Sequence, residues 1–113
     1  ETFDLAVKKY PDAHPLFHSD RGFQYTSKLF KAKLDKQGME QSMSRVGRCI
    51  DNGPMEGFWG ILKCEMYYLN QFETYEELAS AVEQFIYYYN HQRRQHKLNC
   101  LPPATYRSLL EAA

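Results

Sequence analysis

Long apolar runs, paired cysteines and an excess of one charge are all missing from this 113-residue sequence. No apolar stretch approaches the roughly 20 residues that a membrane-spanning helix requires, and the first residues do not resemble a signal peptide. The three cysteines, Cys49, Cys64 and Cys100, are odd in number and form no Cys-x-x-Cys pair. A disulfide framework is therefore not expected, and the protein is predicted to be cytoplasmic with reduced thiols and no membrane partner.

The net charge of zero excludes a generic polyanion binder, but the charges are unevenly distributed. Residues 21–63 contain eight Lys or Arg and four Asp or Glu, whereas residues 64–92 contain five Glu and no Lys or Arg. A basic stretch returns at residues 91–97. These basic stretches are compatible with phosphate contacts, although ordinary solvated helix faces are the simpler explanation on charge alone.

Hydrophobic spacing and capping residues in the first half predict a helix, a strand, a second helix and a second strand. The second helix is capped by Thr26 or Ser27 and ends at Gly38, where a left-handed C-terminal cap is expected. Two short strands form a poor sheet by themselves, and their open edges recruit other chains. We therefore expect a homodimer or a strand-exchanged oligomer. The predicted elements are a helix over 2–9, a strand over 16–18 ending at Ser19-Asp20, a helix ending near 38 and a strand over 39–44.

The second half is predicted to be helical. Val46 to Gly53 is interpreted as a loop, and Pro54 fits the first turn of the next helix. Thr74 and Glu77 form a capping box that opens the clearest helix of the chain. A final short helix is expected over 104–110, after Pro102-Pro103. The apolar faces predicted for the two longer helices are Met55, Phe58, Trp59, Leu62, Met66 and Leu69, and then Tyr75, Leu78, Ala79, Val82, Phe85, Ile86 and Tyr89.

Two carboxylates stand out for chemistry, Asp20 after the first predicted strand and Glu56 near a helix start, with 35 residues between them. Such a pair can hold a hard divalent cation, and cations held in this way promote phosphodiester cleavage and joining. Each acid also has an ordinary structural explanation. Asp20 suits a turn, and a first-turn Glu56 is favoured by the helix dipole.

With these residues in place, the chain resembles the C-terminal part of the catalytic core of insertion-sequence transposases, which have a retroviral-type integrase core. Three ordered motifs support the resemblance, and the family's 35-residue gap lies between the first two. The motifs are His18-Ser19-Asp20-Arg21-Gly22-x-Gln24-Tyr25, Asp51-Asn52-x-x-x-Glu56-x-Phe58-Trp59-x-x-Leu62-Lys63-x-Glu65, and Tyr88-Tyr89-Asn90-x-x-Arg93-x-x-x-Lys97-Leu98.

The resemblance implies an α/β, incomplete ribonuclease H-like fold that is mostly helical with two short strands. It implies three metal-binding carboxylates, of which Asp20 matches the second Asp and Glu56 matches the Glu. The first Asp belongs to an upstream strand, and Asp4 is no substitute because it lies in a predicted helix. Residues 1–113 are thus expected to be a truncated catalytic core that lacks the first strands and the first catalytic Asp.

In function, the resemblance implies bacterial DNA transposition and integration by metal-dependent strand cleavage and transfer. Mg²⁺ or Mn²⁺ is expected at Asp20 and Glu56, bound weakly here, and the chain alone is expected to be inactive. The alternative is a non-catalytic remnant that binds DNA or self-associates.

Further DNA contacts are expected at Lys63, Asn52 and Arg93. Lys63 shares a helix face with Glu56 and Gly60, and Arg93 lies in the basic stretch. Asp51 and Asn52 either shape the turn into the helix or lie at the edge of the active site, and the sequence does not decide between these roles. Zinc is not expected at His91, His96 and Cys100, because a second cysteine and a recognised ligand spacing are lacking.

Overall fold

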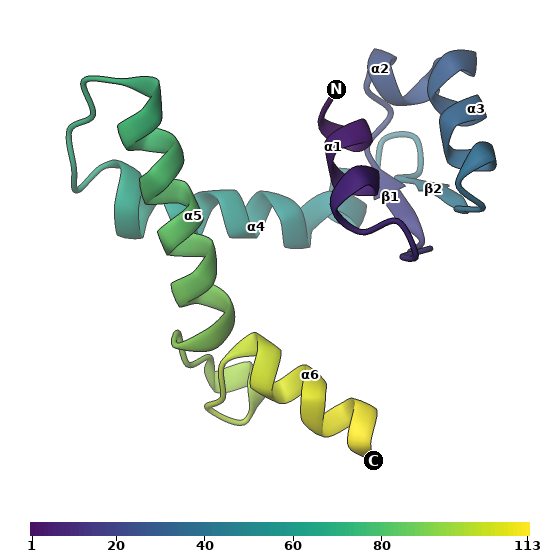
Figure 1. Ribbon diagram of the computed structural model, residues 1–113. Coiled ribbons are helices and arrows are strands. Elements are labelled where there is room, and N and C mark those ends of the chain that lie inside the picture. Colours follow the sequence, from purple (N-terminus) through teal and green to yellow (C-terminus); the bar gives the residue numbers. More distant parts are fainter. The chain divides into compact units, whose positions relative to one another are not determined.

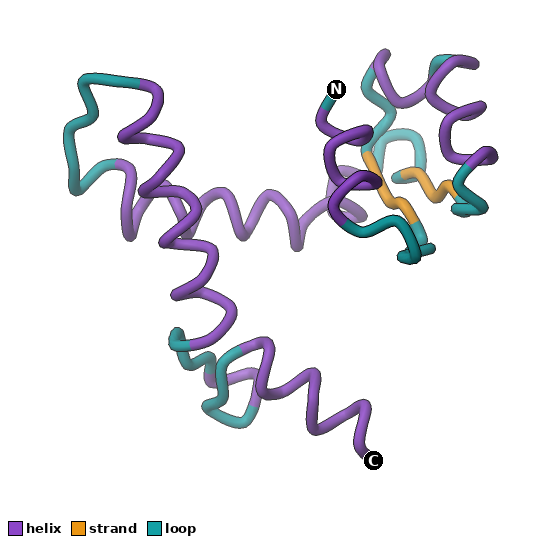
Figure 2. The backbone as a smooth tube through the Cα atoms, viewed as in Figure 1, coloured by secondary structure: helices purple, strands orange, loops and turns teal.

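The computed structural model describes residues 1–113, which form two compact units, residues 1–56 and residues 57–113 (Figure 1). The chain is mostly helical, and its two short strands both lie in the N-terminal unit (Figure 2). This confirms the predicted content of many helices and two strands. None of the helices has the length and apolar character needed to cross a bilayer.

The N-terminal unit is built around a two-stranded parallel sheet. Phe17 pairs with Gln41 and Ser19 with Met43, and the connection between the strands is helical, as parallel pairing requires. The elements of this unit are α1 (Thr2–Lys9), β1 (Phe17–Ser19), α2 (Phe23–Thr26), α3 (Lys28–Lys36), β2 (Gln41–Met43) and the 3₁₀ helix η1 (Cys49–Asn52).

Helix α3 is closed at both ends by the residues that the sequence indicated. The Ser27 side chain accepts a hydrogen bond from the Phe30 N–H at 3.1 Å, so Ser27 is the N-cap rather than Thr26. At the other end Gly38 has φ +65°, and the Met39 N–H donates to the Leu34 carbonyl at 3.0 Å. This Schellman motif turns the chain from α3 toward β2.

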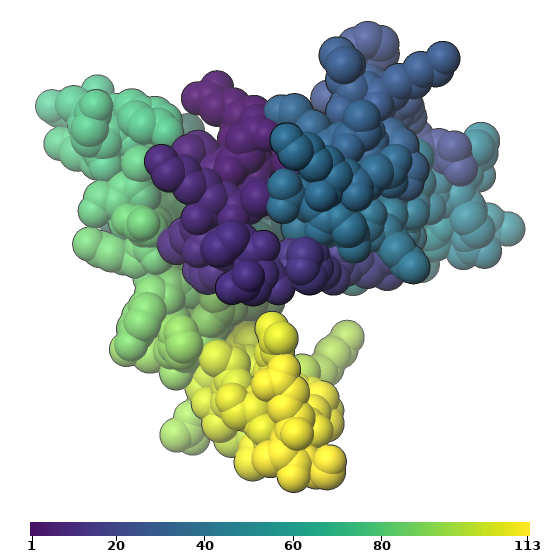
Figure 3. Space-filling model, turned by 45° about the vertical axis from the view of Figure 1, so that its right-hand side comes forward, coloured from purple at the N-terminus to yellow at the C-terminus, as the bar shows by residue number.

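The core of the N-terminal unit combines an aromatic cluster with a fully buried leucine. Leu34 is the one large side chain in the molecule with no exposed surface. Across α1 and α3, Lys33 donates to both carboxylate oxygens of Asp4 at 2.8 Å, and Figure 3 shows these segments side by side. The aromatic cluster consists of Phe3, Phe17, Tyr25 and Phe30, with ring centroids 5.2–6.2 Å apart.

The C-terminal unit has a separate core, formed where the end of α4 packs against α5. Leu62, Met66 and Phe85 are buried there, and Phe58 and Tyr89 pack against them. The elements are α4 (Gly53–Leu62, whose first turn belongs to the N-terminal unit), the π-helical segment Lys63–Tyr67, α5 (Tyr75–His91), the 3₁₀ helix η3 (His96–Leu98) and α6 (Pro103–Ala112).

Helix α5 begins as predicted, with one difference in its cap. The Thr74 hydroxyl accepts from the Glu77 N–H at 3.2 Å, which is half of a capping box. Glu77 reaches back to the Glu73 N–H at 2.9 Å and not to Thr74. The side chain therefore closes a slightly larger loop than the motif predicts.

The predicted apolar face of the first C-terminal helix is only partly buried. Leu62 and Met66 are buried, but Met55, Trp59 and Leu69 are 53%, 45% and 73% exposed. Leu69 lies beyond Tyr67, the last residue of the π-helical segment, in the turn that follows, so the helical spacing that selected it no longer applies there. On α5, Tyr75 and Ile86 of the predicted apolar face are likewise exposed, and Tyr75 lies in the first turn.

Three predicted boundaries are also corrected. The first strand runs over 17–19 rather than 16–18, and Leu16 is 62% exposed. The second strand starts at Gln41, because the Met39 N–H is already used in closing α3. The segment predicted as a loop, 46–53, contains η1 and the first residue of α4. The four-residue helix α2 was not predicted.

Candidate functional site

Asp20 lies directly after β1, at the carboxyl edge of the parallel strands. Its side chain is exposed, and Oδ1 accepts a hydrogen bond from the Gly22 N–H at 2.8 Å. A Cβ at position 22 would lie 2.9 Å from the same oxygen, closer than normal packing permits. Glycine at 22 therefore allows the turn to bring its backbone N–H onto Asp20 and fix the direction of the carboxylate.

The residues on either side of Asp20 are joined to the backbone of Ser44, just after β2, by one backbone and one side-chain hydrogen bond. The Ser44 N–H donates to the Ser19 carbonyl, and the Arg21 Nε donates to the Ser44 carbonyl, both at 2.9 Å. Ser19 and Ser44 are buried, each with 6% of its surface exposed. Asp20 thus stands between two residues that both bind Ser44, so its backbone is held from both sides.

His18 adds a side-chain connection between the same strands. Its Nδ1 lies 2.9 Å from the Ser42 hydroxyl, and its Nε2 lies 3.4 Å from the Ser44 hydroxyl. A serine hydroxyl can donate or accept, so either neutral tautomer of the ring satisfies both contacts. The histidine of the His-Ser-Asp motif is therefore engaged in holding the sheet edge.

Asp51 is bound by Arg45 through three hydrogen bonds. Asp51 Oδ2 accepts from the Arg45 backbone N–H and from Nε, both at 2.9 Å, and Oδ1 accepts from Nη2 at 2.8 Å. The Arg45 side chain holds the pKa of the Asp51 carboxyl far below its ordinary value, aided by the backbone bond. Of the two roles left open by the sequence, this geometry favours shaping the turn. Asn52, the last residue of η1, is half-buried.

Glu56 lies in the first turn of α4 and is the last residue of the N-terminal unit. Its side chain is exposed, and the free N–H groups of a first turn favour a negative charge there. Both candidate carboxylates are thus exposed residues of one unit, Asp20 after β1 and Glu56 on the helix that comes after the β2 loop. No group of three or more His, Cys, Asp or Glu side chains in the structure is arranged to hold a metal ion.

Arg93, a predicted DNA contact, is engaged inside the C-terminal unit. Its Nε lies 2.9 Å from Glu65 Oε2 and its Nη2 lies 2.6 Å from Oε1. The guanidinium also lies over the Tyr89 ring, 5.7 Å from the centroid, and the Arg93 side chain is 23% exposed. A phosphate would have to displace Glu65 to use the same guanidinium fork. The pair connects the π-helical segment to the residues just after α5.

The Glu65–Arg93 pair makes a pH-dependent contribution to stability. Hydrogen bonds from Arg93 lower the pKa of Glu65, so the stabilisation is complete above about 4.5, the ordinary pKa of glutamate, and is lost as the pH falls through the lower folded value. We expect Glu65→Gln to reduce the free energy of unfolding by about 0.5–1 kcal/mol at pH 7. Urea unfolding at pH 7 and pH 3 measures this, with the difference from wild type shrinking at pH 3.

The exposed Glu83, on α5, provides the matched control. Glu83→Gln should change the free energy of unfolding little at either pH. A Glu65→Gln variant as stable as wild type at pH 7 would show that the ion pair contributes nothing.

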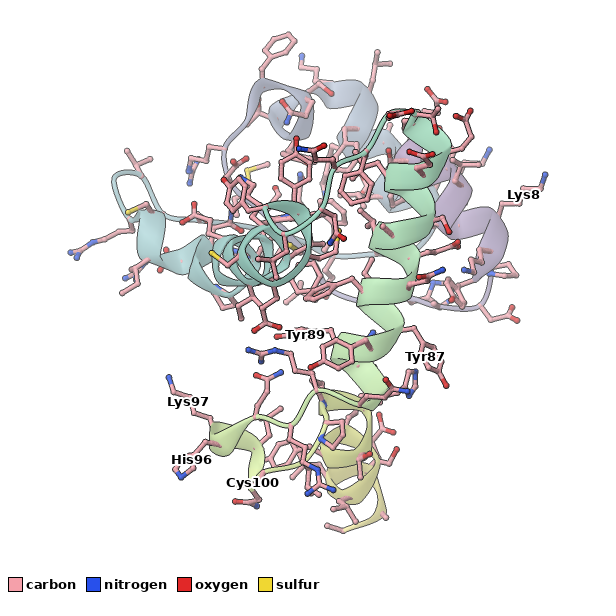
Figure 4. The ribbon with its side chains drawn as sticks, turned by 90° about the vertical axis from the view of Figure 1, so that its left-hand side faces the viewer. Lys8, Tyr87, Tyr89, His96, Lys97 and Cys100 are labelled. Atoms are coloured by element: carbon pink, nitrogen blue, oxygen red, sulfur yellow. The ribbon has the colours of Figure 1, made fainter.

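Lys63 and the segment after α5 present free cationic side chains. Lys63 is the first residue of the π-helical segment and is exposed. His96, Lys97 and Cys100 project from the segment between α5 and α6, while Tyr87 and Tyr89 lie on α5 (Figure 4). Of the basic residues predicted to meet DNA, Lys63 is therefore available to a phosphate, whereas Arg93 is occupied by Glu65.

Comparison with known proteins places these residues in a family context. The integrase core domain family matches residues 56–109, a segment that starts at Glu56 and contains Lys63, Glu65 and Arg93. An uncharacterized transposase-like protein of Haemophilus influenzae is 46% identical over 103 residues, which cover 91% of this chain and 48% of that protein. The putative transposase of insertion sequence element IS150 from Escherichia coli is 45% identical over 106 residues, covering 93% of this chain and 38% of that protein.

The chain is similar to transposases of insertion sequences, and its residues 56–109 match the integrase core domain family. The transposase of insertion sequence element IS904 from Lactococcus lactis is also similar, with 36% identity over 89 residues, or 79% of this chain and 35% of that protein. The chain spans about half or less of the length of these curated proteins. No solved structure matches the chain.

The sequence did not predict the contacts that hold the candidate site. The Arg45–Asp51, Arg21–Ser44 and His18–Ser42 contacts were not predicted, nor was the pairing of Glu65 with Arg93. Arg45 and Asp51 are six residues apart around Gly47, which is a usable sign of a closed loop. The other contacts join residues 23 to 28 positions apart, and no local pattern indicates them.

Proposed function

We propose that this chain is part of a transposase catalytic core that cleaves and joins DNA strands with a divalent metal ion held by Asp20 and Glu56. One observation supports the proposal above the others. The two acids that the family resemblance selects, 35 residues apart, are both exposed in the N-terminal unit, at a sheet edge and at a helix start. Neither position requires a buried charge, so both carboxylates are ready to act as ligands.

The chemistry of the two side chains fits Mg²⁺ or Mn²⁺, which prefer oxygen ligands and keep several waters. When bound, such an ion lowers the pKa of the attacking hydroxyl or water and stabilises the negative charge on the leaving oxygen. Asp20 contributes a carboxylate whose direction is fixed by the Gly22 N–H. Glu56 contributes a longer side chain on a helix, which adds reach and adjustability. With only these two acids, we propose that binding is weak and that the chain by itself is inactive.

DNA is the proposed substrate, and Lys63, Asn52 and Arg93 are the proposed contacts. Lys63 is exposed on the integrase core segment and can meet a phosphate directly. Arg93 would contribute only if the phosphate replaced Glu65. A ribonuclease H-like arrangement of the complete core and a bacterial cytoplasmic location belong to the same proposal.

A non-catalytic, self-associating role is the second candidate, and an apolar groove favours it. In the N-terminal unit, α1, α2, α3 and β1 line a groove of about 1000 Å³. Phe23 and Leu29, which are among its lining residues, are 87% and 81% exposed. Surfaces of this kind recruit partners. A monomeric mass at high concentration in light scattering would speak against the proposed homodimer or strand-exchanged oligomer.

A hybrid protein tests the catalytic proposal with the residues of this chain. In it, the chain replaces the matching 106-residue segment of the IS150 relative, 45% identical to it. We expect the hybrid to mobilise a marked element in cells and to require Mg²⁺ or Mn²⁺ for strand transfer in vitro. A folded hybrid, checked by circular dichroism, that performs neither reaction would contradict the proposal.

A further inference from the structure

A continuous series of hydrogen bonds leads from the residues beside Asp20 to the start of α4. Ser19 and Arg21, the neighbours of Asp20, both bind the backbone of Ser44. The next residue, Arg45, binds Asp51 with its backbone N–H and with two nitrogens of its guanidinium. Asp51 lies in η1, which leads directly into α4.

Packing alone does not explain how this loop is held. Every residue from 46 to 50 is exposed, and Val46 and Ile50 are 80% and 76% exposed despite being apolar. At Gly47, φ is +70° and no atom lies within 4 Å of the place where a Cβ would be. Polar contacts therefore fix its path: those at the two ends of the loop, and two backbone hydrogen bonds of 3.1 Å, from the Arg48 N–H to the Arg45 carbonyl and from the Asp51 N–H to the Arg48 carbonyl.

The carboxylate of Asp51 is the better shielded member of the pair. Its side chain is 18% exposed, whereas that of Arg45 is 71% exposed. Both Asp51 oxygens accept hydrogen bonds from Arg45, and this side-on arrangement uses the planar guanidinium fork. Lysine cannot reproduce that geometry, because it presents a single nitrogen. Asp51 is thus committed to the loop and is not a free ligand.

We infer that Arg45 and Asp51 are positioning residues, which close the loop after β2 and so hold the first turn of α4, with Glu56, in place relative to Asp20. The inference rests on the proposed function, because Asp20 and Glu56, whose relative positions these two residues are inferred to maintain, are only proposed to bind metal. It predicts that, when the Arg45–Asp51 pair is broken, Glu56 no longer binds the same metal ion as Asp20. The sheet edge that carries Asp20 should stay intact.

Nuclear magnetic resonance of the ¹⁵N-labelled 113-residue chain tests this with two readouts. The first is the backbone order parameter of residues 46–56. The second is the broadening of amide signals by Mn²⁺ at residues 20–22 and at Gly53, Met55 and Glu56. We compare wild type with Asp51→Asn and Arg45→Lys. Asp35→Asn is the matched control, since it removes an exposed ion pair with Lys31 on α3.

In wild type we expect order parameters of about 0.85 for residues 46–56 and broadening of both amide groups at the same Mn²⁺ concentration. Asp51→Asn should lower the order parameters below about 0.6 and restrict the broadening to residues 20–22. Arg45→Lys should produce a partial loss of both, and Asp35→Asn should change neither.

Two results would overturn the inference. One is an Asp51→Asn loop as rigid as wild type, and the other is a variant with a mobile loop in which Mn²⁺ still broadens both amide groups together. If Mn²⁺ broadened no amide signals of the wild-type chain, the result would count against the proposed function only. The order parameters would still decide whether the Arg45–Asp51 pair holds α4. If Asp51→Asn fails to fold, Arg45→Lys provides the same comparison.

Discussion

Replacing Asp20 or Glu56 by alanine in the IS150 hybrid should lower the rate of strand transfer by about 10³-fold. Each carboxylate is proposed to hold the ion that stabilises the charge of the attacking and leaving oxygens. A loss of several kcal/mol of transition-state stabilisation, roughly 4 kcal/mol, corresponds to this factor. Strand transfer is measured with a labelled element end at a fixed Mg²⁺ concentration, and transposition of a marked element is counted in cells.

Matched acids control for general effects of lost charge. Asp12 is exposed in the segment before β1, and Glu83 is exposed on α5, so alanine at either should leave strand transfer within about twofold of the hybrid. Glu56→Asp keeps the charge but shortens the side chain, and we expect an intermediate rate. If Asp20→Ala or Glu56→Ala kept the activity of the hybrid, that residue would have no part in catalysis.

Leu34→Ala should lower the stability of the N-terminal unit by about 2–5 kcal/mol. Leu34 is fully buried in α3, and its carbonyl accepts the hydrogen bond that closes the Schellman motif. The substitution removes three carbon atoms and leaves a cavity beside a small core. A unit of 56 residues has only about 3–8 kcal/mol of stability, so much of it would be lost.

Leu29 provides the control for this substitution, since it is the same residue type in the same helix and is 81% exposed. Leu29→Ala should change the stability by less than about 0.5 kcal/mol. Amide hydrogen exchange of residues 28–36 reports on the N-terminal unit directly. Equal exchange rates in the two variants would show that Leu34 does not anchor this core.

The local signals in the sequence predicted the local structure well. Ser27, Gly38 and Thr74 each sit at the helix end where their chemistry is favourable, because caps depend on a few neighbouring residues. The two strands were also predicted, from the bulky run before Asp20 and the weak alternation up to Ser44, but their parallel pairing was not. Their exact bounds depended on hydrogen bonds that a pattern does not specify.

The parts that the sequence did not predict depend on contacts over longer distances. The apolar spacing that places Leu69 on the face of Leu62 is regular, yet the helical segment ends at Tyr67 and Leu69 lies in the turn that follows. Helix α2 has four residues, too few to show a helical period. Arg93 looks like a free cation in the sequence, and only the fold brings Glu65 to it from 28 residues away.

The candidate site divides in the same way. Asp20 and Glu56 were selected from motifs and spacing, whereas the residues that hold them were not. Arg45 and Asp51 carry ordinary loop charges in the sequence, and their three hydrogen bonds emerge only when the loop is closed. Residue type and spacing thus predict which side chains could bind a metal ion, whereas the contacts that hold those side chains depend on the path of the backbone.

The central claim is that Asp20 and Glu56 bind one metal site. The most direct measurement is a crystal of the hybrid soaked in Mn²⁺, with diffraction recorded at the manganese absorption edge. We predict anomalous density whose ions lie about 2.1 Å from carboxylate oxygens of both residues, the distance typical of such hard cations. Density that contacts only one of the two acids, or carboxylates that face away from each other in the metal-soaked crystal, would contradict the claim.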